Sequence, residues 1–272
     1  MAFLCQRYKV SRSGFYAWDA RERSRHSRDD EQLRARIERI HRDSRGRYGS
    51  PRVHEQLKRE GVRCSNKRVA RLMREQGLRA RVSRLYRRST GVHRFFEKTG
   101  NARLELPAPT RTDQIWVGDV TYLRLGKHWR YLATVMDLFS RRIIGWTIAC
   151  NRTTEVTLRA LKRAIALRCP KPGLLFHSDR GIEYSAYGYQ AFLRSRGITP
   201  SMNRPRNCQD NGHMESFFHS LKAELTHQRS FTSDAQLNAS LAGYIERFYN
   251  RKRIHSSLGY HSPVEFECLA NA

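Results

Sequence analysis

The hydrophobic pattern changes its period at Gln114, and this change constrains the fold more than any other feature of the chain. After it come three segments rich in β-branched and aromatic residues, which are typical of strands, at residues 114–125, 129–140 and 141–150. Helical and short apolar patterns then alternate at residues 153–168, 173–179, 186–197 and 198–203. This order predicts an α/β fold with a mixed five-stranded sheet flanked by helices.

A further helix is predicted between residues 207 and 225. If Asp210 or Asn211 caps it, one apolar stripe contains Met214, Phe217, Phe218, Leu221 and Leu225. Glu215 lies off this stripe and shares its face with His219 and Lys222. The position of Glu215 therefore calls for a reason other than packing.

The last predicted helix begins at a capping box formed by Ser233 and Gln236. Its buried side is predicted to contain Leu237, Leu241, Ile245 and Phe248.

Three helices are predicted before residue 78. The first covers residues 29–44; the second has Ser50 as its cap and Pro51 in its first turn, and ends at Gly61. The third starts after Ser65 and stops at Gly77. Its apolar residues are predicted to face inward, while its outward side carries Lys67, Arg68, Arg71 and Arg74. Two short helices of which the second is cationic indicate a DNA-binding helix-turn-helix, and a solvated three-helix bundle is the alternative.

These patterns divide the chain into four parts. We expect a short helical segment at residues 1–26, a helix-turn-helix domain at 27–77, a basic linker at 78–112, and a catalytic core with a C-terminal helix at 113–272.

The charge of the chain indicates a polyanionic partner. Its 52 Lys and Arg outnumber its 25 Asp and Glu, which leaves a net charge of +27. Residues 1–100 hold +17 of that surplus. Such a surplus attracts phosphate in a salt-sensitive way. No apolar run of membrane-spanning length and no signal peptide or lipidation motif is found, so the sequence favours nucleic acid over a membrane.

The six cysteines are scattered and form no C-x-x-C pair, which suits a reducing cytoplasm. Together with the charge, this predicts a cytoplasmic protein associated with nucleic acid.

Three carboxylates stand out by position. Asp119 lies inside an apolar strand, where charged side chains are rare. Asp179 ends the buried strand at residues 173–179, at the carboxyl edge of the predicted sheet. Glu215 follows Asp179 after 35 intervening residues. Carboxylate oxygens are the ligands that Mg²⁺ prefers, and two such ions can serve phosphoryl transfer. The three acids therefore predict a metal site, beside which Lys222 is placed to bind a phosphate.

Each candidate also has a structural interpretation. Asp119 can pair with a buried arginine, Asp179 can cap the turn after it, and Glu215 can pair with His219 or Lys222. His177 can position water or phosphate near Asp179, or serve as a hydrogen-bonded structural histidine. Asp137, a competing ligand, is interpreted as a residue that shapes its turn before Ser140.

The sequence resembles the integrase-like, frame-B transposases of the IS-three family of bacterial insertion sequences, which belong to the retroviral-integrase superfamily. The resemblance runs nearly end to end and rests on YGSPRVHEQL, RVARLMREQGLRA, QIWVGDVTYL, YLATVMDLFSRRIIGW, HSDRGIEY, DNGHMESFFHSLKAEL and YNRKRIHSSLGYHSP. Gly118 and Asn203 stand where relatives often have small or hydroxyl residues.

The resemblance implies a ribonuclease-H-like catalytic core with a D, D, E triad at Asp119, Asp179 and Glu215, and a basic residue at Lys222. It also implies Mg²⁺, replaceable by Mn²⁺, as the cofactor of DNA strand cleavage and 3′-hydroxyl strand transfer. Element ends and target DNA are the implied substrates, with an oligomer assembled on them. The implied partner is an upstream frame-A protein or frameshift fusion, since this chain has no heptad run.

Two other functions remain open. A metal-dependent nuclease of the same fold would have the same acids but would not join ends. A non-catalytic DNA-binding protein would retain all its activity without them.

Overall fold

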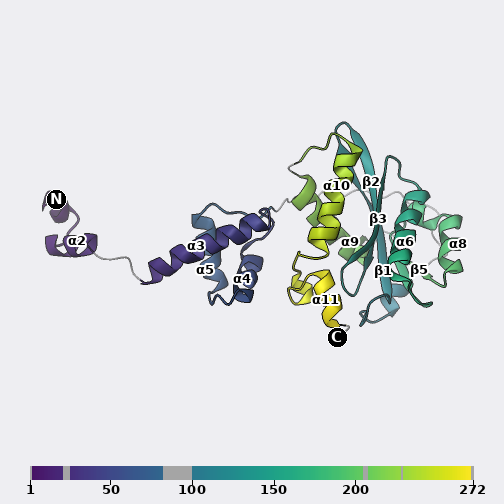
Figure 1. Cartoon of the computed structure of the whole chain (residues 1–272), viewed down its shortest axis with the longest axis horizontal. Coiled ribbons are helices and arrows are strands. Elements are labelled where there is room, and N and C mark those ends of the chain that lie inside the picture. The colour runs from purple at the N-terminus through teal and green to yellow at the C-terminus, as the bar shows by residue number, and fades with distance from the viewer. Residues whose placement is uncertain (1, 21–24, 82–99, 205–207, 228, 271–272) are drawn as a thin grey trace. The chain divides into compact units, whose positions relative to one another are not determined.

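The structure is a computed structural model that describes residues 2–20, 25–81, 100–204, 208–227 and 229–270. It forms two compact units, Met1–Arg81 and Val82–Ala272, and each is described here by itself (Figure 1). In the described residues, no helix combines the length and the hydrophobicity needed to cross a membrane.

The first unit is all-α, as predicted. Its helices are α1 (Ala2–Arg7), α2 (Arg12–Asp19), α3 (Arg25–Asp43), α4 (Ser50–Arg59) and α5 (Asn66–Glu75). Helices α3, α4 and α5 pack on one another around fully buried apolar residues, among them Ile37, Val53, Leu57, Val69 and Leu72. The predicted periodicity of this region is therefore confirmed.

The ends of α4 and α5 show which local sequence signals correctly predicted where a helix begins or stops. Ser65 caps α5, since its hydroxyl accepts a hydrogen bond of 3.2 Å from the amide of Arg68. Gly61 and Gly77 follow the helices with φ of +76° and +68°, which favours glycine. The predicted Ser50 cap is wrong: α4 already begins at Ser50, Gly49 occupies the cap position, and no side chain caps it.

The second unit is built on a five-stranded mixed sheet with the order β3-β2-β1-β4-β5. The strands are β1 (Ile115–Leu125), β2 (His128–Asp137), β3 (Ile143–Ala149), β4 (Leu175–Ser178) and β5 (Thr199–Met202). β1, β2 and β3 pair antiparallel, while β4 is parallel to both β1 and β5. The predicted α/β fold is confirmed.

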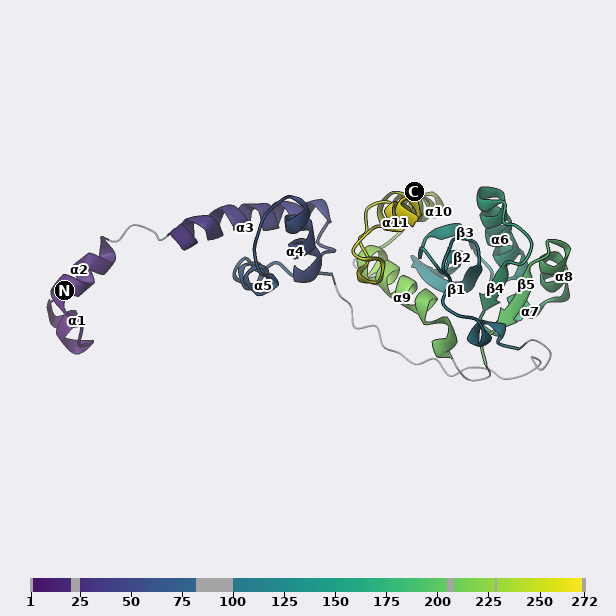
Figure 2. The ribbon, with the colours of Figure 1, turned by 90° about the horizontal axis from the view of Figure 1, so that it is seen from below.

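Helices cover both faces of the sheet (Figure 2). One layer consists of α6 (Thr154–Arg168), α7 (Ile182–Ser185) and α8 (Tyr187–Ser195), and the other contains α9 (Gly212–Leu221) and α10 (Asp234–Ala242). The α6 backbone approaches β3 closely at Gly145, where a Cβ would lie 2.3 Å from the carbonyl oxygen of Ala160. Each sheet face thus has its own apolar cluster.

The stripe predicted for α9 is confirmed. Met214, Phe217, Phe218, Leu221 and Leu225 are all buried, and Glu215 is exposed. Five short helical segments complete the unit: η1 (Ala102–Glu105), η2 (Cys208–Asn211), η3 (Lys222–Thr226), η4 (Gly243–Tyr249) and η5 (Ser256–Leu258).

The sequence missed two features of the C-terminal half. First, α9 and α10 continue as the π-helical segments η3 and η4, where regular helices were predicted. The wider turn of η3 buries three consecutive residues, including Glu224, whose carboxylate accepts hydrogen bonds from Arg253 and Tyr244. Second, an additional helix, α11 (Pro263–Ala270), follows.

Candidate active site

Asp119 and Asp179 come from neighbouring parallel strands. The register of β1 and β4 ends at the pair Gly118 and Ser178, so each aspartate is the next residue beyond it. Asp119 Oδ1 accepts a hydrogen bond of 2.7 Å from the amide of Val120, and Asp179 Oδ1 accepts one of 3.0 Å from the amide of Gly181. The structure therefore brings two of the three predicted acids together at the carboxyl edge of the sheet.

The two carboxyl groups influence each other electrostatically. Burial, and after it the negative charge of Asp179, hold the pKa of Asp119 well above its usual range. The pKa of Asp179 is also raised, first by burial and then by the charge of Glu183. Negative charge gathered in this way is stabilised by a cation, and carboxylate oxygens are the donors that Mg²⁺ prefers. The donor set of this edge therefore fits a Mg²⁺ ion.

Glu215 is not brought to the pair. It lies in the first turn of α9 with an exposed side chain. Within the described part of the chain, no group of three His, Cys, Asp or Glu side chains lies close enough together to hold a metal ion. The candidate site thus contains Asp119 and Asp179 close together, while Glu215 lies on the adjacent helix α9.

A hydrogen bond connects the start of α9 to the strand of Asp119. Asn211 occupies the cap position of α9, but its side chain forms no cap. Its Nδ2 instead donates to the carbonyl oxygen of Gly118 at 3.1 Å. The predicted cap by Asp210 or Asn211 is therefore wrong, because Asn211 bonds to β1 and Asp210 accepts hydrogen bonds from Arg204 and Asn101.

Lys222 lies near Asp119 at the other end of α9. Burial lowers the pKa of Lys222, and the charge of Asp119 acts in the opposite direction. The ammonium nitrogen lies 4.4 Å from the centre of the Tyr122 ring. Lys222 is therefore a cation beside the first aspartate, as its candidate role requires.

Arg152 and Glu183 form an ion pair beside the two aspartates that the sequence did not reveal. Arg152 Nε donates to Glu183 Oε1 at 2.7 Å, and the glutamate side chain is only 5% exposed. Gly181 packs so closely that a Cβ there would lie 2.7 Å from Glu183 Oε1 and 2.9 Å from Asp179 Oδ1. The pair thus fixes the turn that carries Asp179. Its arginine places a positive charge near both aspartates, and its glutamate places a negative one there.

The structure gives His177 a structural role. The ring is fully buried, with Nδ1 at 2.9 Å from Ser201 Oγ and Nε2 at 2.7 Å from Asn203 Oδ1. Burial lowers the pKa of His177 to about 4, so the ring is neutral near pH 7. A buried ring whose two nitrogens are both in use favours the structural interpretation of His177 over a contact with water or with a phosphate of DNA. Asn203 thereby acquires a role as a partner of His177.

Asp137 shapes its turn, as interpreted from the sequence. Its Oδ1 accepts hydrogen bonds from the amides of Phe139 and Ser140, at 3.0 and 3.1 Å, and its Oδ2 accepts one from the amide of Asp113.

The cationic side of α5 is smaller than predicted. Arg68 Nε and Arg71 Nη2 donate to the two oxygens of the buried Asp30 carboxylate, each at 2.6 Å, and Arg71 also pairs with Glu75. These two arginines therefore connect α5 to α3. Lys67 and Arg74 are exposed, and neither has an ion-pair partner among the described residues.

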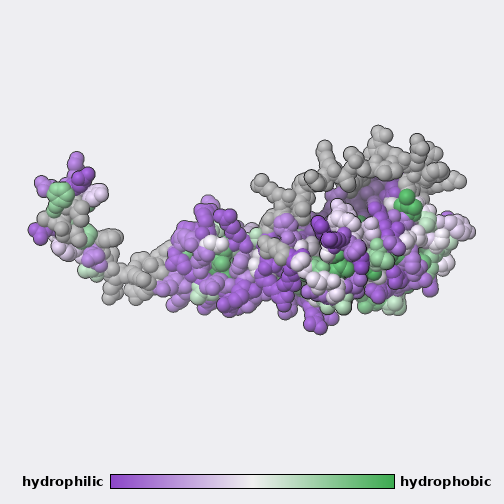
Figure 3. Space-filling model, turned by 90° about the horizontal axis from the view of Figure 1, so that it is seen from above, coloured by the Kyte–Doolittle hydropathy of each residue, from purple (hydrophilic) through white to green (hydrophobic). Residues whose placement is uncertain are grey.

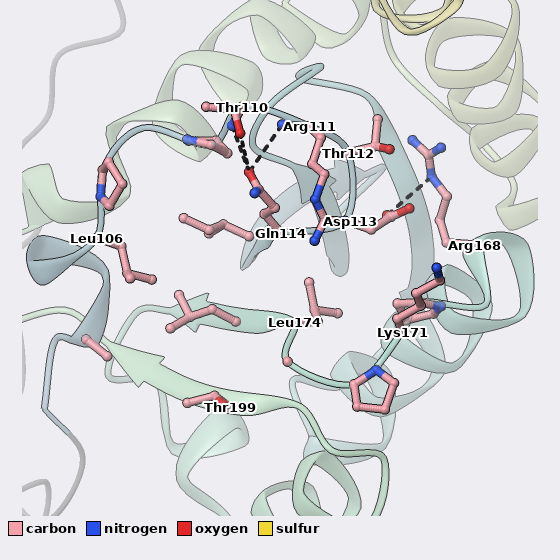
Figure 4. A pocket seen from close by; sticks show the side chains of 18 of the residues that line it. Leu106, Thr110, Arg111, Thr112, Asp113, Gln114, Arg168, Lys171, Leu174 and Thr199 are labelled. Carbon is pink, nitrogen blue, oxygen red and sulfur yellow. Dashed lines mark hydrogen bonds and ion pairs between the residues drawn. The ribbon is translucent and has the colours of Figure 1, made fainter. Parts of the chain in front are cut away.

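A cavity lies at the opposite end of the sheet from the aspartates, at the starts of β4 and β5. It has a volume of about 770 Å³ and is lined by the segment before β1, the end of α6 and the starts of β4 and β5. Figure 4 shows Gln114 bonded to the chain at Thr110 and Arg111, and Asp113 facing Arg168. None of the predicted site residues lines it.

Comparison with known proteins identifies both units. The family described as "Integrase core domain" matches residues 109–208, a second family of that description matches residues 196–263, and "HTH-like domain" matches residues 27–86. The chain is 38% identical over 264 residues to an uncharacterised 31 kDa protein of insertion element IS600 of Shigella sonnei, covering 97% of each chain. It is 36% identical over 268 residues to the transposase InsF for insertion sequence IS3A of Escherichia coli (strain K12), covering 97% of this chain and 92% of that protein.

Among solved structures, the chain is similar to one in a simian T-cell lymphotropic virus intasome complex with a PP2A regulatory subunit. The identity is 15%, the TM-score is 0.50, and the match covers 85% of this chain and 74% of that one, which shows the fold alone. From its identity to the insertion-sequence proteins over nearly its whole length, the chain belongs to the IS3 (IS-three) family of transposases, with an integrase core domain preceded by an HTH-like domain.

Proposed function

We propose that this transposase cleaves a DNA strand at the end of its element and joins the freed 3′ hydroxyl to a target strand. Asp119, Asp179 and Glu215 are its proposed catalytic residues and metal ligands. The observation that carries the proposal is the pair of electrostatically interacting aspartates, Asp119 inside β1 and Asp179 directly after β4, beside a helix joined to β1 through Asn211.

The two aspartates would hold Mg²⁺, for which Mn²⁺ is a substitute, and Glu215 from α9 would complete the donor set when DNA is bound. Bound there, two such ions supply activation of the attacking oxygen and stabilisation of the leaving oxygen. Arg152 and Glu183 keep the Asp179 turn in place, and Lys222 binds a phosphate of the strand that reaches Asp119. The hydrogen bond between Asn211 and Gly118 keeps the α9 end that carries Glu215 beside the strand of Asp119.

DNA binding by the first unit is proposed to come from Lys67 and Arg74 on α5.

The proposed domains are those predicted from the sequence: a helical segment at 1–26, the helix-turn-helix domain at 27–77, a linker at 78–112 and the core at 113–272. Of that linker, residues 82–99 lie outside the described residues, while Arg103 donates to the carbonyl oxygen of Asp210 at 2.7 Å. The further proposed partners are element ends, target DNA, a second copy of the chain on DNA, and an upstream frame-A protein or fusion.

The test is a strand-transfer assay with labelled, pre-cut 3′ hydroxyl ends and a plasmid target in Mg²⁺ or Mn²⁺. We expect Asp119→Asn, Asp179→Asn and Glu215→Gln each to lower joining by more than about a hundredfold, since loss of the outer partners of a metal ligand alone costs about ten- to a hundredfold. The control variant is Glu38→Gln, which changes an exposed helical glutamate in the first unit. Joining by this variant should equal that of the wild type.

Metal binding is measured separately from activity. Mg²⁺ at about 100 times its dissociation constant should stabilise the folded wild type by about 2.7 kcal/mol, and this gain should be lost in Asp119→Asn. Metal-dependent nicking without joining would favour a nuclease. Absence of both nicking and joining in the wild type, with DNA binding unchanged in the three variants, would assign the chain to the non-catalytic DNA-binding proteins.

A further inference from the structure

The hairpin of β1 and β2 extends beyond the end of β4 (Figure 1). It carries exposed aromatic side chains. Tyr122 is opposite Tyr131 and Arg124 is opposite Trp129, so these four side chains share one face of the sheet. Farther along the same face, Ala133 and Val135 pack in the apolar cluster under α6. Tyr122 and Trp129 lie beyond this cover and remain 56% and 48% exposed.

The two exposed rings are arranged in a defined way. Their centres lie 5.1 Å apart and their planes are perpendicular. The Lys222 ammonium lies over the Tyr122 ring, 4.4 Å from its centre, in the range of a cation–π interaction. Tyr122 follows Asp119 by three residues on β1, so the rings lie next to the candidate active site.

The hairpin has other contacts that hold it. Arg130 donates two hydrogen bonds, at 2.6 and 2.8 Å, to the carboxylate of Asp234 at the start of α10. The amide of Gly126 in the turn donates to the carbonyl oxygen of Phe231 at 3.1 Å. The hairpin is thus connected to the α10 side of the unit through Arg130 and its turn, and the exposed rings are not the groups that attach it.

Exposed aromatic rings among cations are the composition of a surface that binds single-stranded nucleic acid. The same hairpin carries the cations Arg124 and Lys127. Hydrophilic residues predominate on the face of the molecule drawn in Figure 3, and hydrophobic residues occupy small areas of it. Stacking on an aromatic ring suits any base, because every base has a π face. Bases inside a duplex already stack on one another, so the occupant must be a base that has left its stack.

We propose that Tyr122 and Trp129 form a stacking platform for one unpaired nucleobase of the DNA strand that enters the candidate active site. The proposal rests on the proposed function, because it is the catalysed strand that supplies the base. Lys222 holds the Tyr122 ring and lies beside the backbone of that strand.

The test measures binding in EDTA, where no strand is cut. The probes are a duplex with a short single-stranded 3′ end that contains 2-aminopurine, and a blunt duplex of the same sequence. For Trp129→Leu we expect binding of the single-stranded end to weaken by about ten- to a hundredfold, with loss of the 2-aminopurine quenching, while blunt-duplex binding is unchanged. Trp129→Tyr keeps a ring and should stay within about threefold of wild type.

Two controls isolate stacking from folding. Leu167→Ala removes a side chain that is 56% exposed near the end of α6, and should change neither affinity. The melting temperature should be the same for the leucine and tyrosine variants of Trp129. Three results would overturn the platform and leave only a cross-strand pair of aromatic residues. They are an equal loss of affinity for both probes, unchanged quenching in Trp129→Leu, and a parallel loss of stability and binding in both variants of Trp129.

The platform and the proposed function fail independently. Unchanged base binding in Trp129→Leu together with normal strand transfer by wild type removes only the platform. Base binding that depends on Trp129 in a protein that transfers no strand removes only the proposed chemistry, and Glu215→Gln should retain that binding.

Discussion

Gly118 shows how a single residue determines the backbone beside the first aspartate. A Cβ at this position would lie 2.5 Å from Phe176 Cζ. The Phe176 ring is 1% exposed and packs against Tyr184 and Tyr189, so it cannot move aside easily. The residue before Asp119 is therefore restricted by packing against the neighbouring strand, and only the tertiary structure reveals that neighbour.

We predict that Gly118→Ala lowers the free energy of unfolding by about 1–3 kcal/mol, the usual cost of overpacking a core. Strand transfer should fall as well, because a shift of β1 displaces Asp119. Gly243→Ala is the matched control: nothing lies within 4 Å of a Cβ there and its φ is −61°, so it should stabilise the fold by about 0.4–1 kcal/mol. Denaturant titration of both variants checks the prediction, and equal stabilities would contradict it.

At the scale of elements, α5 has two kinds of cation. Arg68 and Arg71 are bound to Asp30, whose pKa is lowered overall: burial raises it, and the hydrogen bonds from the two arginines outweigh burial. Their function is to hold α5 on α3. Lys67 and Arg74 are the exposed ones that can bind phosphate.

We predict that the double change Lys67→Ala and Arg74→Ala weakens DNA binding and reduces the salt dependence of log Kd by a slope of about 2, since each phosphate contact contributes about 0.9. The comparison variant, with alanine at Arg68 and Arg71, removes two charged partners of the buried Asp30 carboxylate and should chiefly lower stability. DNA titrations over a range of salt concentrations, combined with thermal melts, separate the two effects. An unchanged slope in the first variant would exclude those side chains from the interface.

At the scale of the whole molecule, each unit has its own apolar core. Ile37 is fully buried with Val53 and Leu57 in the first unit, while both clusters of the second unit involve the sheet. Because the cores share no residues, a cavity in one should not propagate to the other.

We predict that Ile37→Ala destabilises the first unit by about 2–5 kcal/mol and leaves the unfolding of the second unit unchanged. Scanning calorimetry should show that one transition shifts and the other remains. DNA affinity should fall as the first unit unfolds, whereas Mg²⁺ should still stabilise the second transition. A common shift of both transitions would show that the units unfold together.

The sequence by itself determined the elements and their buried faces, because periodicity is a local property. The stripe from Met214 to Leu225, the Ser65 cap and the change of period at Gln114 could be read from neighbours only a few residues apart. The position of Asp119 inside a strand and that of Asp179 at the end of one followed from the same pattern, and the motifs predicted the family.

Only the tertiary structure decided which side chains meet. Arg152 meets Glu183 across 31 residues, Arg71 meets Asp30 across 41, and Asn211 meets Gly118 across 93. Such pairs depend on how strands and helices are arranged in space, and no local period encodes them. For this reason the sequence placed Arg68 and Arg71 on the DNA-binding side of their helix and left two roles open for His177. Packing uses the arginines to join two helices and buries the histidine in the sheet.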